Sequence, residues 1–252
     1  MKHSIALFTL TTVLCSAPAA LAQEAALTRA DVERTIRSYL VEHPELLVEM
    51  SQALEKRRAA EQRERSQTAV AANRTAVFED AASPAAGAAK DPEVVTVVEF
   101  FDYRCGYCKK VAPAVAKLVA ENPAVRVVFK EFPILGPESK TASLAALAAA
   151  RQGGYAKFHR ALMESGDFSE DSLKRLAVEA GLDAARLVAD MRSPELEAEL
   201  VKNQTLAQAL DIQATPSFVI GDQVIAGAPG EGELRDLIAK AKRAALVTRE
   251  GN

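Results

Sequence analysis

The sequence lacks tryptophan, contains only three cysteines in 252 residues, and carries a formal charge of only −3. So small a net charge gives no indication of a nucleic-acid partner. After residue 22, no apolar run reaches the roughly 20 residues that a membrane-crossing helix requires. The composition is otherwise that of a globular protein, with 49% hydrophobic and 26% charged residues. The length suits one large domain, alone or with an appendage.

The first 22 residues have the pattern of a cleaved export signal. Lys2 and His3 give a basic start, Ile5 to Leu14 form an apolar stretch, and Ala20-Leu21-Ala22 matches an A-x-A cleavage site. We therefore predict cleavage after Ala22 and a periplasmic mature chain. A membrane anchor is the alternative, and the short apolar stretch disfavours it.

Removal of that signal, with Cys15 in it, would leave two cysteines, Cys105 and Cys108. They are too close in sequence for a disulfide between them to close a large stabilising loop. A zinc site usually needs four ligands, and the chain has no second Cys/His pair to complete one. We therefore expect no metal and no cofactor, and redox chemistry is the function that remains for the pair.

Residues 23–75 are predicted to form a helical segment that lies before the main domain. Thr28 and Asp31 form a variant of the capping box, and Pro44 suits the first turn of a second helix. A heptad-like seam follows, with spacings of four and three, through Ile36, Leu40, His43, Leu47, Met50 and Leu54. The segment has too few large apolar residues for its own core, so its apolar stripe must pack elsewhere. We favour self-association of copies, and folding back onto the same chain is the alternative.

The rest of the chain is predicted as a linker over residues 76–92, a catalytic domain over 93–246 and a tail over 247–252. Ser83-Pro84, Gly87 and several alanines indicate the linker. A helical insertion over about 138–210 divides the catalytic domain, because only helical patterns occur there.

Strand patterns flank that insertion. The β-branched run 93–101 is typical of a buried strand, 105–119 reads as a helix kinked at Pro113, and 125–129 reads as a second strand. Ser217–Ile220 and Gln223–Ala226 form a hairpin around Gly221-Asp222, and a closing helix follows. The order βαβ, helices, ββα indicates an α/β fold with a parallel strand pair.

A Cys-x-x-Cys motif alone is a moderately specific signal, but the position of this one strengthens it. Cys105 and Cys108 come directly after a buried strand and at the start of a helix, where amides and dipole favour a thiolate. We expect Cys105 to be the exposed nucleophile and Cys108 the more buried resolving thiol. Positive charge from Arg104, Lys109 and Lys110 either favours the thiolate further or only aids solubility.

Two segments resemble the DsbA family of periplasmic disulfide proteins. Phe100 to Lys109, with its Cys-Gly-Tyr-Cys, is similar to the family's active site, and Ala214-Thr215-Pro216-Ser217-Phe218 is similar to its cis-proline loop. The resemblance covers about residues 93–242 and implies a thioredoxin-like fold with a helical insertion. It also implies a cis Thr215–Pro216 bond that faces the cysteines, keeps metals away and leaves the Thr215 backbone free for an extended client. An ordinary strand-entry proline is the alternative.

Glu99 is the third candidate for the site, six positions before Cys105 within the predicted strand. A half-buried carboxyl group there would have a raised pKa and could relay the Cys108 proton. Related thioredoxin-like enzymes carry an acid at the matching position. The alternative is a glutamate at the strand end that reaches solvent. We interpret His43 and His159 as structural.

The Gly106-Tyr107 dipeptide lacks the histidine of strong DsbA oxidases, and with Thr215 it is similar to DsbC-type isomerases. A self-associating segment before a DsbA-like domain resembles the family of suppressor-of-copper-sensitivity protein C (ScsC). These resemblances imply an oligomeric disulfide isomerase or reductase. Its partners would be misfolded or disulfide-bonded exported proteins and a membrane thiol reductant or oxidant. The alternatives are a monomeric dithiol oxidase and a copper-binding periplasmic protein, because a reduced Cys-x-x-Cys can take Cu(I).

Overall fold

The computed structural model of the chain describes residues 27–91 and 93–250. The predicted export signal and its cleavage after Ala22 lie outside the described residues. The chain divides into two compact units, Met1–Glu55 and Lys56–Asn252, and each is considered by itself below. Of the helices described, none is long and apolar enough to cross a membrane.

The described part of the first unit is helical. It holds α1 (Arg29–Glu42) and the beginning of α2 (Glu45–Ala72). The predicted capping box is confirmed, since the Thr28 side chain accepts from the amide of Asp31 while the Asp31 carboxylate accepts from the amide of Thr28. No residue of α1 is buried, so its apolar side chains face outward in the single chain.

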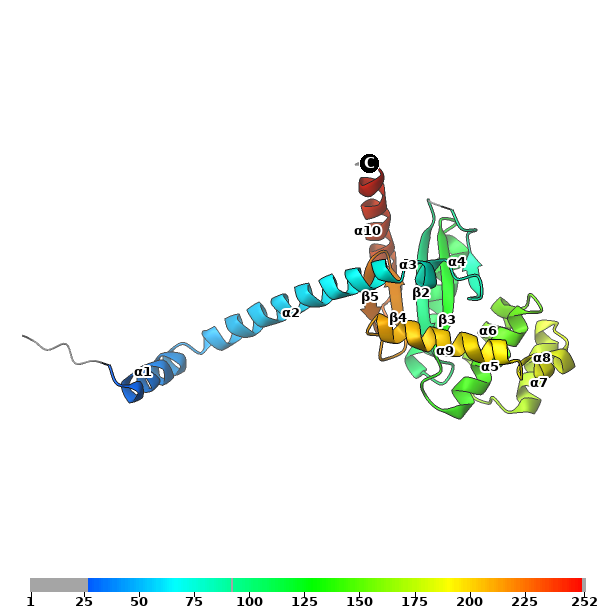
Figure 1. The fold of residues 1–252 in the computed structure, drawn as a ribbon, viewed down its shortest axis with the longest axis horizontal. Helices are drawn as coiled ribbons and strands as arrows, with labels where there is room; N and C mark the ends of the chain where they lie inside the picture. The colour runs from blue at the N-terminus through cyan, green and yellow to red at the C-terminus, as the bar shows by residue number, and fades with distance from the viewer. Residues whose placement is uncertain (1–26, 92, 251–252) are drawn as a thin grey trace, which may run out of the picture. The chain divides into compact units, whose positions relative to one another are not determined.

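The second unit is built on a five-stranded sheet with the order β1-β3-β2-β4-β5 (Figure 1). The strands are β1 (Ala85–Gly87), β2 (Val95–Phe101), β3 (Val125–Glu131), β4 (Ser217–Ile220) and β5 (Gln223–Ala226). β2 and β3 are parallel, as the βαβ pattern predicts, and the other pairs are antiparallel. The predicted hairpin of β4 and β5 is confirmed, and Gly221 in its turn has a φ of +65°.

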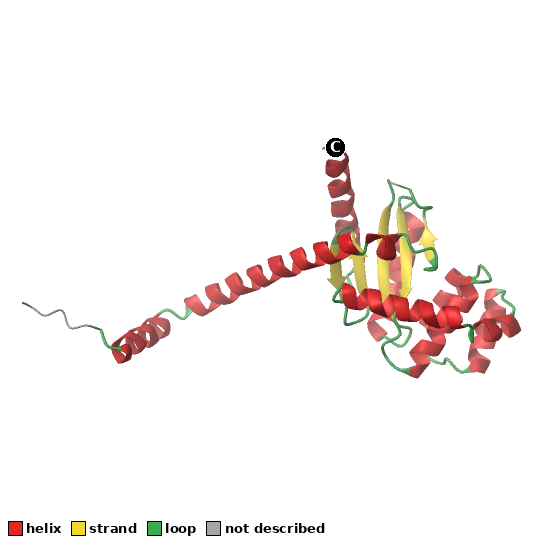
Figure 2. Ribbon diagram, in the orientation of Figure 1, coloured by secondary structure: helices red, strands yellow, loops and turns green. Residues whose placement is uncertain are grey.

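Helices cover both faces of this sheet (Figure 2). Besides the C-terminal part of α2, the helices of this unit are α3 (Arg74–Phe78), α4 (Gly106–Glu121), α5 (Pro137–Ala150), α6 (Tyr155–Glu164), α7 (Glu170–Ala180), α8 (Ala184–Asp190), α9 (Pro194–Ala209) and α10 (Glu231–Glu250). Of these, α7 and α8 pack on other helices of the insertion rather than on the sheet. α5 to α9 form the predicted insertion between β3 and β4. α4 continues through Pro113 to Glu121, and α10 extends through most of the predicted tail 247–252 to Glu250.

Alternate residues of β2 enter two separate cores. Val97 and Phe101 pack with α4, α10 and much of the insertion, in what we call the cysteine-face core. Val98 and Phe100 point the other way and form the opposite core. The helical members of the opposite core are Val70, Val77, Leu206, Ala207 and, directly after α9, Leu210. A strand buried on both faces in this way reads as the continuous apolar run seen in the sequence.

The opposite core corrects the predicted extent of the N-terminal appendage. Val70 of α2 and Val77 of α3 are buried in it, and Ser66 Oγ accepts a hydrogen bond of 2.8 Å from the Val224 amide. The C-terminal part of α2 therefore belongs to the catalytic unit, and the separate segment ends near residue 55 rather than 75. The sequence obscures this boundary because the helix continues across it without a break.

The predicted linker over residues 76–92 is also corrected, because it contains α3 and β1. β1 pairs with β3, and hydrogen bonds of 2.9 Å from the Phe129 amide to the Pro84 carbonyl and from Ala88 to Val125 flank the pairing. Gly87 has a φ of +90°, and a Cβ there would lie 2.5 Å from the Val125 carbonyl oxygen. The glycine that suggested a loop is thus required by the close approach of two strands.

Candidate active site

The two cysteines lie where β2 leads into α4. Cys105 is the N-cap residue of α4, and its sulfur accepts a hydrogen bond of 3.4 Å from the Cys108 amide. That amide is one of the free N–H groups at a helix start, which favour negative charge on an acceptor. Both cysteines are free thiols in the structure. The sequence therefore locates the pair correctly at a helix N-terminus.

The thiol of Cys105 is more buried than the sequence indicates. Only 7% of the residue is exposed, whereas Tyr107 between the two cysteines is 68% exposed. The Cys105 sulfur donates a hydrogen bond of 3.2 Å to the Thr215 carbonyl oxygen. The expectation of an exposed nucleophile is thus wrong for the chain by itself, because the thiol turns inward toward the loop that precedes β4.

That loop has the geometry which the resemblance to DsbA implies. The Thr215–Pro216 peptide bond is cis. Pro216 is buried, and its carbonyl accepts from the Gly227 amide at 2.9 Å, which ties the loop to the end of β5. Because the Cys105 thiol contacts the Thr215 carbonyl, the structure brings Cys105, Thr215 and Pro216 together.

Cys108 faces the interior of the cysteine-face core. It is fully buried, and burial raises the pKa of the Cys108 thiol far above its usual range. The neighbouring Cys105 sulfur and the charge of Glu99 raise that pKa further. A proton acceptor close to Cys108 would therefore be needed before its sulfur could act as a nucleophile.

Glu99 is deeply buried rather than solvated at a strand end. It lies on β2 between Val97 and Phe101, which share the sheet face that α4 covers. Glu99 is 2% exposed, its Oε1 has no hydrogen-bond partner among the described residues, and burial raises the pKa of its carboxyl group to about 8. The structure thus places a protonatable carboxyl group on the Cys108 side of the sheet.

Two of the three basic residues near the motif, Arg104 and Lys109, contact other parts of the catalytic unit. Arg104 donates to the Leu135 carbonyl at 2.7 Å and pairs with Glu138 at 3.1 Å. Lys109 donates to the Ser165 carbonyl, and its ammonium group lies 5.7 Å from the centre of the Phe168 ring. For Arg104 and Lys109, these contacts favour an organising role over simple solubility.

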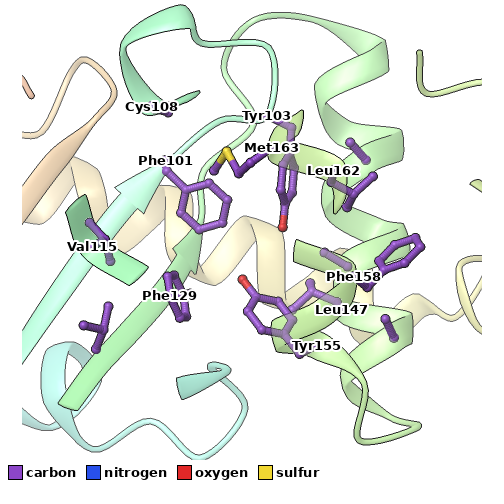
Figure 3. Close-up of a cluster of buried hydrophobic side chains, with 14 of the residues drawn as sticks. Phe101, Tyr103, Cys108, Val115, Phe129, Leu147, Tyr155, Phe158, Leu162 and Met163 are labelled. Carbon is purple, nitrogen blue, oxygen red and sulfur yellow. The ribbon is translucent and has the colours of Figure 1, made fainter. Parts of the chain in front are cut away.

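Sequence reasoning missed a second buried carboxyl group, Glu131 at the end of β3. Its Oε1 accepts hydrogen bonds from the hydroxyl groups of Tyr155 at 2.8 Å and Tyr103 at 3.1 Å, and Figure 3 shows these hydroxyl groups directed toward one another. Burial raises the pKa of Glu131 to about 8 although both hydroxyl groups lower it. An acid that ends an apolar strand was the available signal in the sequence.

His159 belongs to the same buried group. Its Nδ1 lies 2.9 Å from the Tyr103 hydroxyl oxygen, and its ring packs against Phe101, Phe129 and Tyr155. Burial lowers the pKa of His159 to about 3, so the ring is neutral at ordinary pH. This packing agrees with its interpretation as structural. His43 also has local contacts, with the Tyr39 ring and with Glu45 at 3.0 Å.

Among the described residues, no group of three or more His, Cys, Asp or Glu side chains is arranged to hold a metal ion. The two reduced cysteines are the soft ligands that the described site offers. Their arrangement suits thiol–disulfide exchange: a thiol at a helix start, a second thiol one turn further along, and a buried acid behind them.

Comparison with known families agrees with this chemistry. A model of the DsbA-like thioredoxin domain matches residues 96–239, which is more than half of the chain. The chain belongs to the DsbA-like thioredoxin family. A second model, the copper resistance protein ScsC N-terminal domain, matches residues 29–61. This DsbA-like protein therefore combines the thioredoxin domain and the N-terminal helical domain that its sequence indicates.

Solved structures support the same assignment. A thioredoxin-like oxidoreductase from Silicibacter pomeroyi is 44% identical, with a TM-score of 0.63, over 68% of this chain and 98% of that one. ScsC from Proteus mirabilis is 29% identical, with a TM-score of 0.63, over 86% of this chain and 99% of that one. A periplasmic thioredoxin-like protein from Salmonella enterica is 32% identical, with a TM-score of 0.61, over 68% and 95%.

Curated relatives fall into two groups. Disulfide bond formation protein D of Bacillus subtilis is 28% identical over 168 residues, which cover 60% of this chain and 74% of that protein. Na(+)/H(+) antiporter NhaA 3 of Salinispora tropica is 30% identical over 129 residues, half of this chain. The match spans only about a fifth of the antiporter's length. The chain spans only about a fifth of the length of the first curated relatives it matches, and the shared part is the DsbA-like domain. From the family and its structural neighbours, this domain is a thiol–disulfide oxidoreductase domain.

Proposed function

We propose that the protein is a periplasmic, oligomeric disulfide isomerase or reductase. The observation that carries this proposal is the exposed apolar surface of the first unit. In the single chain, Ile36 and Tyr39 are each 54% exposed, and the seam continues through the exposed residues Leu40, Leu47, Met50 and Leu54. Large apolar side chains at heptad-like spacing are unfavourable when exposed to water. We propose that another copy of the chain covers them.

The first step of the proposed exchange is attack by the Cys105 thiolate on a client disulfide. The Cys105 thiol first gives up its proton to solvent water, and the Cys108 amide stabilises the resulting charge from 3.4 Å. The thiolate then bonds to one client sulfur, and the other client sulfur leaves as a thiolate. Cys105 and the client are joined in a mixed disulfide, with no net gain or loss of electrons.

Two outcomes follow from that mixed disulfide. In isomerisation, another client thiolate displaces Cys105, so the enzyme returns to its dithiol form. In reduction, Cys108 attacks Cys105, the client leaves with two thiols and the enzyme becomes a disulfide. We propose that Glu99 accepts the Cys108 proton in this second case, in the minority of molecules whose carboxyl group is ionised at pH 7. Its burial, its raised pKa of about 8 and its place on the same sheet face support that role.

We propose that clients are misfolded or disulfide-bonded exported proteins, held as extended strands against Thr215. The Thr215 backbone lies beside Cys105, with 3.2 Å between the Cys105 sulfur and the Thr215 carbonyl oxygen, which suits recognition that depends little on client sequence. Several sites in one oligomer would bind a misfolded client by avidity. A membrane thiol reductant is the proposed partner that restores the dithiol.

The direction of exchange and the location are inferred from the sequence. Gly106-Tyr107 provides no histidine to stabilise the Cys105 thiolate as in strong oxidases, so the dithiol form gives up its electrons more readily than theirs does. A pair that a membrane reductant keeps reduced is then suited to isomerisation or reduction rather than oxidation. The export signal pattern of residues 1–22 and the similarity to a periplasmic protein of Salmonella enterica support a periplasmic location.

The decisive experiment is refolding of a scrambled multi-disulfide protein by the mature chain, residues 23–252. Deletion of residues 23–55 is the key variant, because Ser66, Val70 and Val77 belong to the catalytic unit and must stay. We expect the deletion to give a monomer in sedimentation experiments that loses isomerase activity and keeps dithiol reductase activity. Cys105→Ala in the full mature chain serves as the inactive control.

Other results would point to the alternatives. If the deletion leaves the oligomeric state unchanged, the first unit does not mediate assembly and the proposal is wrong. If the mature chain is a monomer that oxidises a reduced client without rearranging a scrambled one, it is a dithiol oxidase. Activity that requires copper and disappears with a Cu(I) chelator would instead indicate a copper-binding protein.

A further inference from the structure

Asp102 is a buried carboxylate that joins the start of the cysteine motif to a separate loop. Its Oδ1 accepts hydrogen bonds from the Arg104 amide at 2.7 Å and the Ser139 hydroxyl at 2.8 Å. Its Oδ2 accepts from the amides of Ile134 at 2.9 Å and Leu135 at 3.0 Å. The residue is completely buried. We call these four contacts the Asp102 brace.

The brace reaches the reactive cysteine through the backbone. The Cys105 amide donates to the Asp102 carbonyl at 3.1 Å, which closes the turn that leads into α4. Arg104, whose amide the carboxylate holds, directly precedes Cys105. Its side chain returns to the same loop through the Leu135 carbonyl at 2.7 Å. The cysteine turn and the loop after β3 are therefore tied together by both side chains and backbone.

We propose that Asp102 is a positioning residue for exchange, whose carboxylate fixes the turn that aims the Cys105 sulfur at the Cys108 amide and the Thr215 carbonyl. The proposal rests on the role of Cys105 as nucleophile proposed above. Both sulfur contacts, at 3.4 Å and 3.2 Å, require Cys105 to keep its N-cap conformation. Without the hydrogen bonds to Asp102, the turn would be mobile, and the Cys105 sulfur would make each of these two contacts only part of the time.

The donors around Asp102 require a carboxylate rather than any polar side chain. Three of them are backbone N–H groups, which cannot become acceptors, and only the Ser139 hydroxyl can reverse its role. An asparagine has one oxygen, which would keep more hydrogen bonds if it faced Ile134 and Leu135. Its NH₂ group would then face the Arg104 amide. Asp102→Asn is therefore expected to release the cysteine turn while it keeps the loop.

The test is the alkylation rate of Cys105 by iodoacetamide in the reduced mature chain. The rate is measured from pH 5 to pH 9 by mass spectrometry of the Cys105 peptide. In Asp102→Asn we expect the rate at pH 7 to fall about three- to tenfold, the effect of about one lost hydrogen bond. Loss of a negative charge alone would favour the thiolate and accelerate alkylation, so a fall identifies lost positioning.

Lys130→Met is the matched structural control. Lys130 belongs to the opposite face of the sheet, where it pairs with Asp80, and the substitution should lower thermal stability without reaching the cysteine turn. We expect its alkylation rate to stay within about twofold of the wild type, because the two sites share no partner. A rate for Asp102→Asn at or above the wild-type value, or an equal fall in both variants, would overturn the proposal.

Two further results keep the outcomes distinct. If the wild-type chain shows no preference for alkylation at Cys105 over Cys108, the proposed nucleophile is wrong, whatever Asp102→Asn does. If circular dichroism shows that Asp102→Asn does not fold, Ser139→Ala decides, since it removes only one donor from Oδ1. We expect a fall of about twofold in that variant, and an unchanged rate would count against the brace.

Discussion

Lys130 and Glu131 are neighbours on β3 that face opposite sides of the sheet, and each is buried in a different way. Lys130 pairs with Asp80 at 2.9 Å and donates to Ser83 Oγ at 2.7 Å. Glu131 instead accepts hydrogen bonds from two hydroxyl groups, and no ion pair links it to a cation among the described residues. The buried Lys130–Asp80 ion pair joins two segments of the fold and keeps both groups charged. A buried carboxyl group without a cation instead keeps its proton toward neutral pH, as Glu99 does nearer the cysteines.

The titration behaviour of the two faces differs accordingly. Burial alone would raise the pKa of Asp80, but hydrogen bonds from Lys202 and Lys130 outweigh burial and hold that pKa well below its usual range. On the cysteine face, burial dominates and raises the pKa values of both Glu99 and Glu131 to about 8. The opposite face should therefore lose stability in acid, and the cysteine face should lose it as pH rises.

The largest effect is expected when the carboxylate that pairs with Lys130 is removed. Asp80→Asn leaves the Lys130 ammonium buried without its carboxylate, and we expect the free energy of unfolding to fall by about 3 kcal/mol. Because the pKa of Asp80 is depressed, its stabilisation is present above about pH 4 and is lost as pH falls. Urea unfolding from pH 3 to pH 7 measures both effects. Lys202→Met, whose side chain is 48% exposed, is the control and should cost less than about 1 kcal/mol.

The next effect concerns the unpaired face. Glu99→Gln should stabilise the protein by about 3 kcal/mol at pH 7, because the raised pKa of Glu99 makes the carboxyl group costly above the unfolded value of 4.5. The gain should be small near pH 4.5, grow with pH and level off above about pH 8. The same variant should slow reduction of a disulfide client about 100-fold, since Cys108 loses its proton acceptor. Urea unfolding of both proteins at pH 5 and pH 8 measures the gain in stability. An equal gain at the two pH values would contradict a buried acid with a raised pKa.

The smallest effect is expected when a hydroxyl group that donates to Glu131 is removed. Tyr155→Phe removes the 2.8 Å hydrogen bond to Glu131 and should cost about 1 kcal/mol at pH 7. Because that hydroxyl group lowers the pKa of Glu131, its loss should raise the pKa, and the deficit should grow between pH 7 and pH 9. Thermal unfolding at those two pH values provides the measurement. A deficit that shrinks with pH would show that Tyr155 does not act on Glu131.

The features that the sequence predicts correctly are local ones. The Cys-x-x-Cys after a buried strand, the capping box at Thr28 and the hairpin at Gly221 each depend on a few adjacent residues. Resemblance to the DsbA family adds the cis bond at Pro216, which spacing alone does not predict. Glu99 is recognisable because a charged residue within an apolar strand is unusual.

The features that the sequence does not predict depend on distant partners. β1 is Ala-Ala-Gly, with no β-branched residue, and only its hydrogen bonds with β3 make it a strand. Three of the four donors to Asp102 come from residues more than 30 positions away. The burial of Cys105 likewise depends on Thr215, 110 positions later. No local pattern reports such contacts, because they arise only when the sheet is assembled.

The sheet of the second unit ends in very short strands, three residues in β1 and four in β5. An exposed strand edge is a template on which another chain can add and aggregate. A protein that handles unfolded chains, as proposed, meets such strands constantly. Short edges give a client little to pair with at the sides of the sheet. The backbone at Thr215, beside the reactive sulfur, then becomes the place where an extended client is received and can be released.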